Sequence, residues 1–253
     1  MPPLRRRTDA RPAPRHAWRP GSEPPPREAF TPAERRLIAR LNTPEKVQAY
    51  LNALPYNTEP VRATLRSFRG VLRHHCAHCL EATLFAAVVL EQHGYPTTVI
   101  SFESIDLLDH VIFVYKASGR WGSVARSRDP GLHGRQPVFA TPGALARSYC
   151  DPYVDYTGRV KGYAVVDLAK QMGTYDWRFA GQNVWKVERM LLDYPHHKIH
   201  TSDARYRRLL AWYKAYKATY GEKPIEYRGR ERWSALPPEH RPITARRGRP
   251  PAP

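Results

Sequence analysis

The chain has 253 residues, a formal net charge of +18 and an isoelectric point of about 10.1. Hydrophobic residues make up 42% of it, which is enough for the core of one domain. The longest apolar run, Ala82 to Leu90, is too short to cross a bilayer, and no apolar segment follows the N-terminal arginines. We therefore expect a cytoplasmic protein without a secretory signal or a membrane span. Three cysteines are too few for a disulfide scaffold.

Both ends of the chain have the composition of disordered segments. Residues 1–30 contain eight prolines and seven arginines, and residues 221–253 contain seven more prolines. Such segments bury too little apolar surface to fold. We predict a disordered Pro/Arg-rich leader over 1–30, one folded domain over 31–220, and a disordered basic tail over 221–253.

The first helices are predicted from their capping residues. Thr31-Pro32-Ala33-Glu34 has the spacing of a capping box with proline at the first helical position, and predicts a helix to about Leu41. Thr43-Pro44-Glu45 predicts a second helix, which Pro55 ends. The segment 56–70 is predicted to be mostly loop.

Residues 79–93 predict a helix that is apolar on nearly every side. Gly94 occupies the usual position after a helix C-terminus, and Pro96 prevents continuation. A helix without a polar face belongs in the middle of a core.

The rest of the domain predicts mainly antiparallel strands. β-Branched and aromatic residues predict strands, with a hairpin turn at 118–120, over residues 97–102, 109–116, 121–125 and 163–168. Further helices are predicted over residues 141–149, 184–191 and 203–220. Helices followed by an antiparallel meander indicate an α+β fold and not a doubly wound sheet.

Cys79 and His110 are the residues that could form a nucleophile and its base. Cys79 begins the apolar helix, where free backbone N–H groups and the helix dipole favour a thiolate and could hold an oxyanion. His110 stands near the start of a strand that follows within one connection. A strand packed on the helix could bring its imidazole to the thiol.

The segment from Cys79 to about Trp121, and on to Phe139, resembles the transglutaminase-like superfamily of papain-like cysteine enzymes. Residues 43–72 and 121–139 resemble a bacterial branch of it. A cysteine opens an alanine- and leucine-rich helix that ends fifteen residues later in Gly94-Tyr95-Pro96. A histidine, His110, then precedes an alternating strand, and a glycine turn leads to Trp121.

This resemblance implies a papain-like core with a central buried helix on an antiparallel sheet. It also implies a cysteine hydrolase or acyltransferase, such as a peptidase, that acts on amide bonds of a protein or peptide through a thioester at Cys79. His110 would be the base, and no cofactor is required. The superfamily usually has an aspartate where this chain has Ala125. We predict that Asp129 replaces it and orients His110, with Asp167 as a second candidate.

The missing acid leaves a second interpretation open, in which the domain is a catalytically weakened binding module with a basic surface for an acidic partner or nucleic acid. The basic aromatic stretch 206–220 could bind nucleic acid. We favour an amphipathic helix that packs its apolar face, formed by Tyr206, Leu209, Leu210, Tyr213 and Tyr216. Arg126, Arg128 and Arg135 could favour acidic substrates, although solvated loop charge fits them equally well. The sequence does not indicate an oligomeric state.

The cluster His74-His75-Cys76-Ala77-His78-Cys79 has further interpretations. A zinc site usually pairs a C-x-x-C with a second, distant pair of ligands, and the remaining cysteine is Cys150 alone. A thioredoxin-like redox site needs a strand before the motif, and none is predicted. A reversible disulfide between Cys76 and Cys79 would switch the nucleophile off. We therefore do not predict a metal.

Overall fold

The computed structural model describes residues 19–106 and 110–221. Most of the predicted leader and tail, residues 1–18 and 222–253, lies outside these ranges. The described elements are, in chain order, η1 (Arg27–Ala29), α1 (Pro32–Arg40), α2 (Pro44–Ala53), α3 (Phe68–His74), α4 (Cys79–Glu91), β1 (Thr98–Ser104), β2 (Val111–Ala117), β3 (Arg120–Val124), η2 (Pro130–Leu132), β4 (Arg135–Phe139), α5 (Pro142–Arg147), α6 (Cys150–Tyr153), β5 (Val160–Asp167), α7 (Leu168–Met172), α8 (Trp185–Asp193), β6 (His197–Lys198) and α9 (Asp203–Tyr220).

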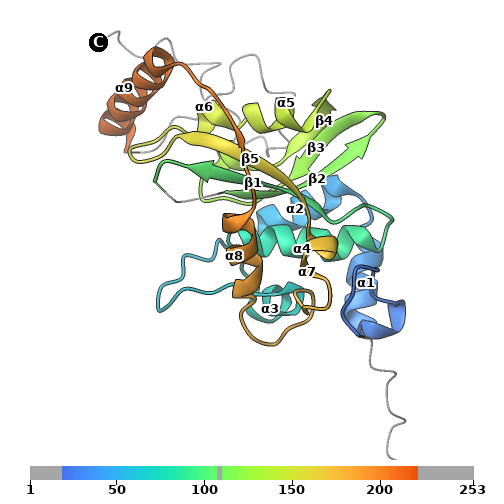
Figure 1. The fold of residues 1–253 in the computed structure, drawn as a ribbon. Helices are drawn as coiled ribbons and strands as arrows, with labels where there is room; N and C mark the ends of the chain where they lie inside the picture. Colours follow the sequence, from blue (N-terminus) through green and yellow to red (C-terminus); the bar gives the residue numbers. More distant parts are fainter. Residues whose placement is uncertain (1–18, 107–109, 222–253) are drawn as a thin grey trace, which may run out of the picture.

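The strands form one antiparallel sheet in the order β4-β3-β2-β1-β5-β6. β1, β2 and β3 follow one another as the sequence predicts, and β4, which it does not predict, extends the sheet beside β3. β5 returns to the other side of β1, so β1 and β2 lie in the middle of the sheet (Figure 1). The α+β class predicted from the sequence is confirmed.

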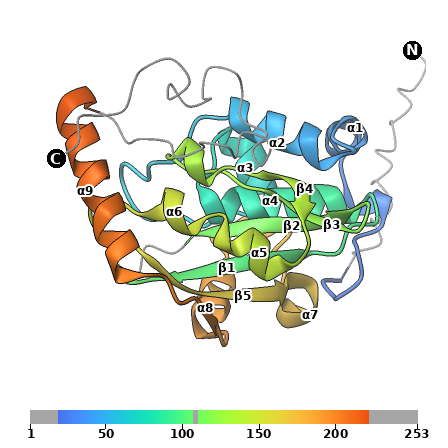
Figure 2. The same ribbon diagram turned by 90° about the horizontal axis from the view of Figure 1, so that it is seen from above.

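Helices cover both faces of this sheet. α2, α3, α4 and α8 lie on one face, and α5 and α6 lie on the other (Figures 1 and 2). Alternate strand residues therefore enter two cores: Val99 and Phe113 pack with α4, whereas Ile100 and Ile112 pack with α5 and α6. Burial on both faces explains why the central strands read as continuous apolar runs.

α4 is the central buried helix that the sequence predicts. Every residue from Leu80 to Glu91 is buried. Gly94 has a φ of 82°, the left-handed conformation that favours glycine after a helix. The hydroxyl of Thr83, one turn into the helix, lies 2.9 Å from the carbonyl oxygen of Val111 at the start of β2. This contact joins the first turn of α4 to the residue that follows His110.

The packed part of the chain begins before residue 31, where the sequence places the end of the leader. Phe30 is buried against the rings of Phe68 and Phe179. The carbonyl oxygen of Pro25 accepts a hydrogen bond from the Gln92 side chain. This packing could not be predicted from the proline-rich composition, because much of it is made by backbone carbonyl oxygens such as that of Pro25.

Several short elements escape sequence-based prediction. α3 falls partly in the segment expected to be loop, and begins where Ser67 caps it. β4 contains Pro137, which removes a backbone donor and weakens a strand pattern.

In α9, whose bounds match the predicted helix, only Tyr213 is buried. The expected apolar packing face is therefore mostly half-exposed.

Across residues 19–106 and 110–221, no helix combines the length and the apolar composition needed to span a bilayer.

Candidate active site

Cys79 is the first residue of α4, directly after the N-cap His78. Its thiol is free of disulfide bonds, and the residue as a whole is partly exposed. The first backbone N–H groups of a helix have no partner within the helix and form its positive end. The local sequence thus places a sulfur where a negative charge is stabilised.

His110 lies immediately before β2, with only 3% of its surface exposed. Its Nε2 lies 3.0 Å from the carbonyl oxygen of Leu132. A carbonyl can only accept, so Nε2 carries the proton and Nδ1 is the nitrogen left to face other groups. The side chain is also close enough to the Cys79 sulfur to lower the pKa of that thiol. The structure therefore brings together the two residues that the sequence singles out.

The pKa of Cys79 is lowered to about 5. Burial by itself would raise it, but the hydrogen bonds and charges of His110 and His78 outweigh this effect. At neutral pH the sulfur is therefore a thiolate, the form that acts as a nucleophile. The third cysteine, Cys150, differs because burial raises its pKa to about 11.

His78 contacts the same sulfur, although the sequence suggested it only as a metal ligand. Its Nε2 lies 2.9 Å from the Thr64 carbonyl oxygen, and its Nδ1 accepts from the backbone N–H of Leu80. The position could have been recognised from the spacing of His78 and Glu81, which form a capping box in which both reciprocal bonds are present.

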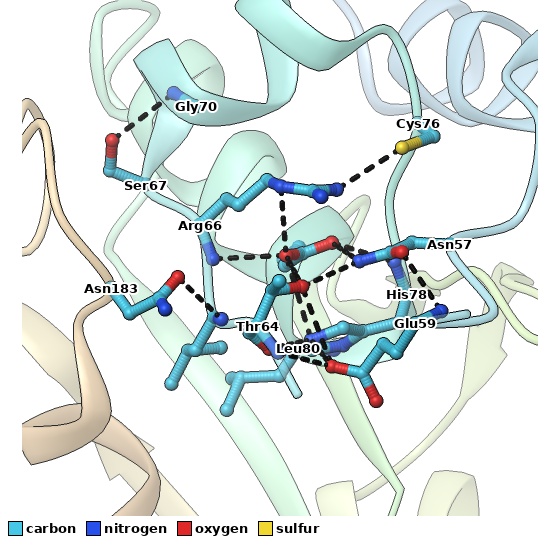
Figure 3. Close-up of polar contacts among 12 residues, drawn as sticks. Asn57, Glu59, Thr64, Arg66, Ser67, Gly70, Cys76, His78, Leu80 and Asn183 are labelled. Atoms are coloured by element: carbon cyan, nitrogen blue, oxygen red, sulfur yellow. Dashed lines mark hydrogen bonds and ion pairs between the residues drawn. The ribbon is translucent and has the colours of Figure 1, made fainter. Parts of the chain in front are cut away.

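Glu81 organises the surroundings of His78. Its side chain is fully buried and accepts hydrogen bonds from the backbone N–H groups of His78 and Arg66 and from the side chains of Asn57 and Thr64. Figure 3 shows how the 57–66 loop folds around this point. One carboxylate therefore joins the loop to the first turn of α4.

Asp129 is not the hydrogen-bond partner that the structure gives His110. Its Oδ1 accepts from the backbone N–H of Gly131, and its carbonyl oxygen accepts from the N–H of Leu132. These bonds cap η2, the turn that presents the Leu132 carbonyl to His110. Ala125, at the position where the superfamily has its aspartate, is fixed by two hydrogen bonds between its backbone and the Gln48 side chain.

Asp167, the second candidate acid, serves another purpose. It caps α7 and accepts a hydrogen bond from Thr97 at the start of β1. His110 instead pairs with Phe102, toward the other end of β1. Asp167 therefore stands at the far end of this strand from the cysteine–histidine pair.

The three arginines considered for substrate recognition have different environments. Arg135 is buried, with its guanidinium donating to the carbonyl oxygens of Gly131 and His133. Arg126 donates to the Leu54 carbonyl oxygen and Arg128 is exposed. Arg135 is thus a structural residue of the loop, because its charge is used on backbone carbonyls inside the protein.

Tyr56 stands between this arginine-bearing loop and the nucleophile. Its ring lies 5.8 Å from the guanidinium of Arg126 and 6.0 Å from that of Arg128. Burial raises the pKa of its hydroxyl well above the usual range, and the backbone of Cys79 interacts with the same hydroxyl. A phenol therefore lies beside the helix N-terminus, near the N–H groups that could hold an oxyanion.

The His/Cys-rich segment does not gather into a metal site in the part of the chain that the structure describes, where no three His, Cys, Asp or Glu side chains converge as ligands. His74 and His75 are exposed at the end of α3. The Cys76 sulfur lies 3.1 Å from a guanidinium nitrogen of Arg66 (Figure 3). The zinc interpretation thus has no ligand cluster within these ranges.

Fold and site define an α+β protein with a cysteine–histidine pair at the head of its central helix. No protein-family model matches the sequence, and a search of curated proteins finds no match. Among solved structures, the chain is similar to calcium-bound LapG of Legionella pneumophila, with 15% sequence identity and a TM-score of 0.32. The alignment covers 62% of this chain and 87% of LapG. The relationship is distant at most, and the roles of the residues are argued from the geometry of this chain alone.

Proposed function

We propose that this protein is a transglutaminase-like cysteine enzyme that acts on amide bonds of a protein or peptide substrate through a thioester at Cys79. The observation that carries this proposal is the contact of the Cys79 sulfur with His110 at the N-terminus of α4, together with the low pKa of the thiol. A buried structural cysteine has no need of either feature. Its pKa would rise, as it does for Cys150.

The reaction would follow the chemistry of a thiolate nucleophile. The sulfur attacks the carbonyl carbon of the amide, and the negative oxygen that forms is held by N–H groups at the start of α4 or by the hydroxyl of Tyr56. The intermediate collapses when the C–N bond breaks and the amine leaves with a proton from the His110 imidazolium. Water or a second amine then attacks the thioester and returns a proton to His110.

The first test compares the reactivity of the three cysteines. Iodoacetamide should alkylate Cys79 much faster than Cys76 or Cys150 at neutral pH, as mapped by mass spectrometry of the full chain. Because its pKa is about 5, the rate should rise through that pH and change little from pH 7 to 9. Equal rates for the three thiols would refute a nucleophilic Cys79.

A second test asks for the thioester itself. p-Nitrophenyl acetate should acetylate Cys79 with a burst of nitrophenol, and Cys79→Ala should abolish the burst. His110→Gln should slow acylation by about 10²- to 10⁴-fold, the usual contribution of a general acid–base residue. Cys76→Ala is the matched control and should acylate like the parent chain.

One observation supports a second function, the binding of nucleic acid. α9 exposes Arg207 and Arg208, and the rings of Trp212, Tyr216 and Tyr220 follow one another along it with centroid distances of 6.3 and 4.5 Å. Basic side chains beside aromatic rings suit single strands. Poly(U) should bind in a salt-dependent manner, more weakly to the Arg207→Glu/Arg208→Glu variant and equally to Cys79→Ala. Absence of binding at physiological salt would eliminate this function.

A further inference from the structure

We propose that His78 is a second catalytic imidazole of this site, which holds the Cys79 thiolate while His110 transfers protons to and from the reacting groups. The inference rests on the proposed function. It gives His78 a role that neither Cys79 nor His110 performs. Its starting point is the position of His78 at the N-cap of α4, where a short serine, threonine, asparagine or aspartate is usual.

The ring of His78 is fixed in orientation by its distal nitrogen. Nε2 lies 2.9 Å from the carbonyl oxygen of Thr64, which can only accept, so Nε2 carries a proton in every state of the ring. The 57–66 loop thereby directs Nδ1 back toward the first turn of α4. This is the nitrogen that meets the N-terminus of α4, at the residue that follows Cys79.

Nδ1 has two alternative uses, which depend on protonation. In the neutral ring it accepts a hydrogen bond from the backbone N–H of Leu80, at 3.2 Å, and caps the helix. A protonated Nδ1 can no longer accept and must donate instead, and the Cys79 thiolate is the acceptor at hand. A proton taken up from solvent at His78 thus balances the thiolate charge, while the proton that leaves the thiol passes to His110 for transfer to the leaving amine. The Leu80 N–H becomes free for an oxyanion.

The charges around His78 favour its protonated form. A carboxylate oxygen of Glu81, in α4, lies 3.7 Å from Nε2, and one of Glu59, in the loop, lies 3.9 Å from it. Glu188 of α8 also interacts electrostatically with His78 and Cys79. On the opposing side, the Nε of Arg66 lies 3.9 Å from Glu81, and the His110 side chain shares the sulfur. Burial lowers the pKa of His78, but the Cys79 and Glu81 interactions outweigh it and raise the pKa to about 9.

His110 has different surroundings. Apart from the Cys79 sulfur and an electrostatic interaction with His133, the contacts described for its ring are with neutral groups, the Leu132 carbonyl oxygen and the rings of Phe102 and Tyr149. Two imidazoles on one sulfur therefore stand in unlike environments, one among carboxylates and one among neutral groups. This difference is the physical basis for the division of roles, because carboxylates stabilise the cation that balances a thiolate.

The decisive experiment substitutes His78 with asparagine in the full chain. Asparagine is a good N-cap and keeps an acceptor for the helix N–H groups, but it cannot carry the positive charge. The alkylation profile of Cys79 with iodoacetamide should move to higher pH by a unit or more, which is about a two-fold lower rate at pH 6 and about a ten-fold lower rate at pH 4, with near-parental rates at pH 9. His75→Asn, at an exposed residue with a φ of 52°, is the matched control and should leave the profile unchanged.

A second measurement needs no change at His78. The imidazole of His78, followed by NMR, should titrate near pH 9 in the parent chain and clearly lower in Cys79→Ser, because the thiolate that stabilises its proton is gone. An unchanged alkylation profile in a folded His78→Asn, or an unchanged His78 titration in Cys79→Ser, would overturn the proposal. A fast-reacting Cys79 would then still support the proposed enzyme, so the two failures are distinguishable.

Discussion

The carbonyl oxygen of Leu132 orients the His110 ring. Leu132 belongs to a short turn, η2, which is fixed by the side chains of Asp129 and Arg135. Asp129 caps the start of this turn through the N–H of Gly131, and the buried guanidinium of Arg135 binds the carbonyl oxygens of Gly131 and His133. A backbone carbonyl can orient an imidazole as a carboxylate does, but it adds no full negative charge to the ring. Asp129 then acts as a positioning residue, one turn removed from the ring.

Two substitutions distinguish a capping role of Asp129 from a direct charge effect on His110. Asp129→Asn keeps an oxygen that can accept from Gly131, so acylation by p-nitrophenyl acetate should stay within a factor of about three, or about 0.7 kcal/mol. Asp129→Ala removes the cap and should slow acylation more strongly. Equal losses in both variants would show that the charge of Asp129 is what matters.

At the scale of elements, the site depends on how α4 meets β2. Thr83 is buried between them, and its hydroxyl lies 2.9 Å from the carbonyl oxygens of both Cys79 and Val111. These two residues are the nucleophile itself and the neighbour of His110. One hydroxyl therefore sets the distance between the helix N-terminus and the start of the strand.

Thr83→Val should weaken this junction while it nearly conserves volume. We expect a loss of about 1–3 kcal/mol in the free energy of unfolding, since a buried carbonyl loses its donor. Acylation of Cys79 should also slow. Thr83→Ser retains the hydroxyl and should keep the acylation rate, even if the lost methyl group costs some stability. Urea unfolding and the nitrophenol burst measure the two effects, and a faster burst in Thr83→Val would contradict this role.

At the scale of the whole molecule, one buried ion pair links three distant segments. Arg178 makes two 2.8 Å bonds to the carboxylate of Glu91 at the end of α4, and a third bond to the carbonyl oxygen of Gly21. Both charged side chains are almost completely buried. The N-terminal segment, the central helix and the loop before α8 are thereby held together.

Removal of one partner should be costly because the other charge stays buried. Arg178→Met should lower the free energy of unfolding by about 3–5 kcal/mol, measured in urea. The double variant Arg178→Met/Glu91→Leu should recover much of that loss, since no unpaired charge remains. Additive losses in the double variant would mean that the arginine acts through packing and not through its charge.

Much of the secondary structure and the fold class could be predicted from local sequence patterns. The capping box at Thr31, the apolar run after Cys79 and the alternating strand after His110 depend on residues a few positions apart, and the structure has elements at each of these places. They indicated the α+β class because element order follows from such patterns. The same patterns indicated the placement of Cys79, since a helix start can be recognised from neighbouring residues.

What the sequence by itself determined is therefore the set of elements and the cysteine at the head of a buried helix. Only the tertiary structure decided which groups surround that sulfur: the approach of His110, the Leu132 carbonyl behind it, the inward turn of Arg135 and the anchoring of His78 on Thr64. Each of these contacts joins segments from different loops or is made to backbone atoms. Side-chain patterns do not encode backbone acceptors, and loop paths depend on the packing of the complete sheet and its helices.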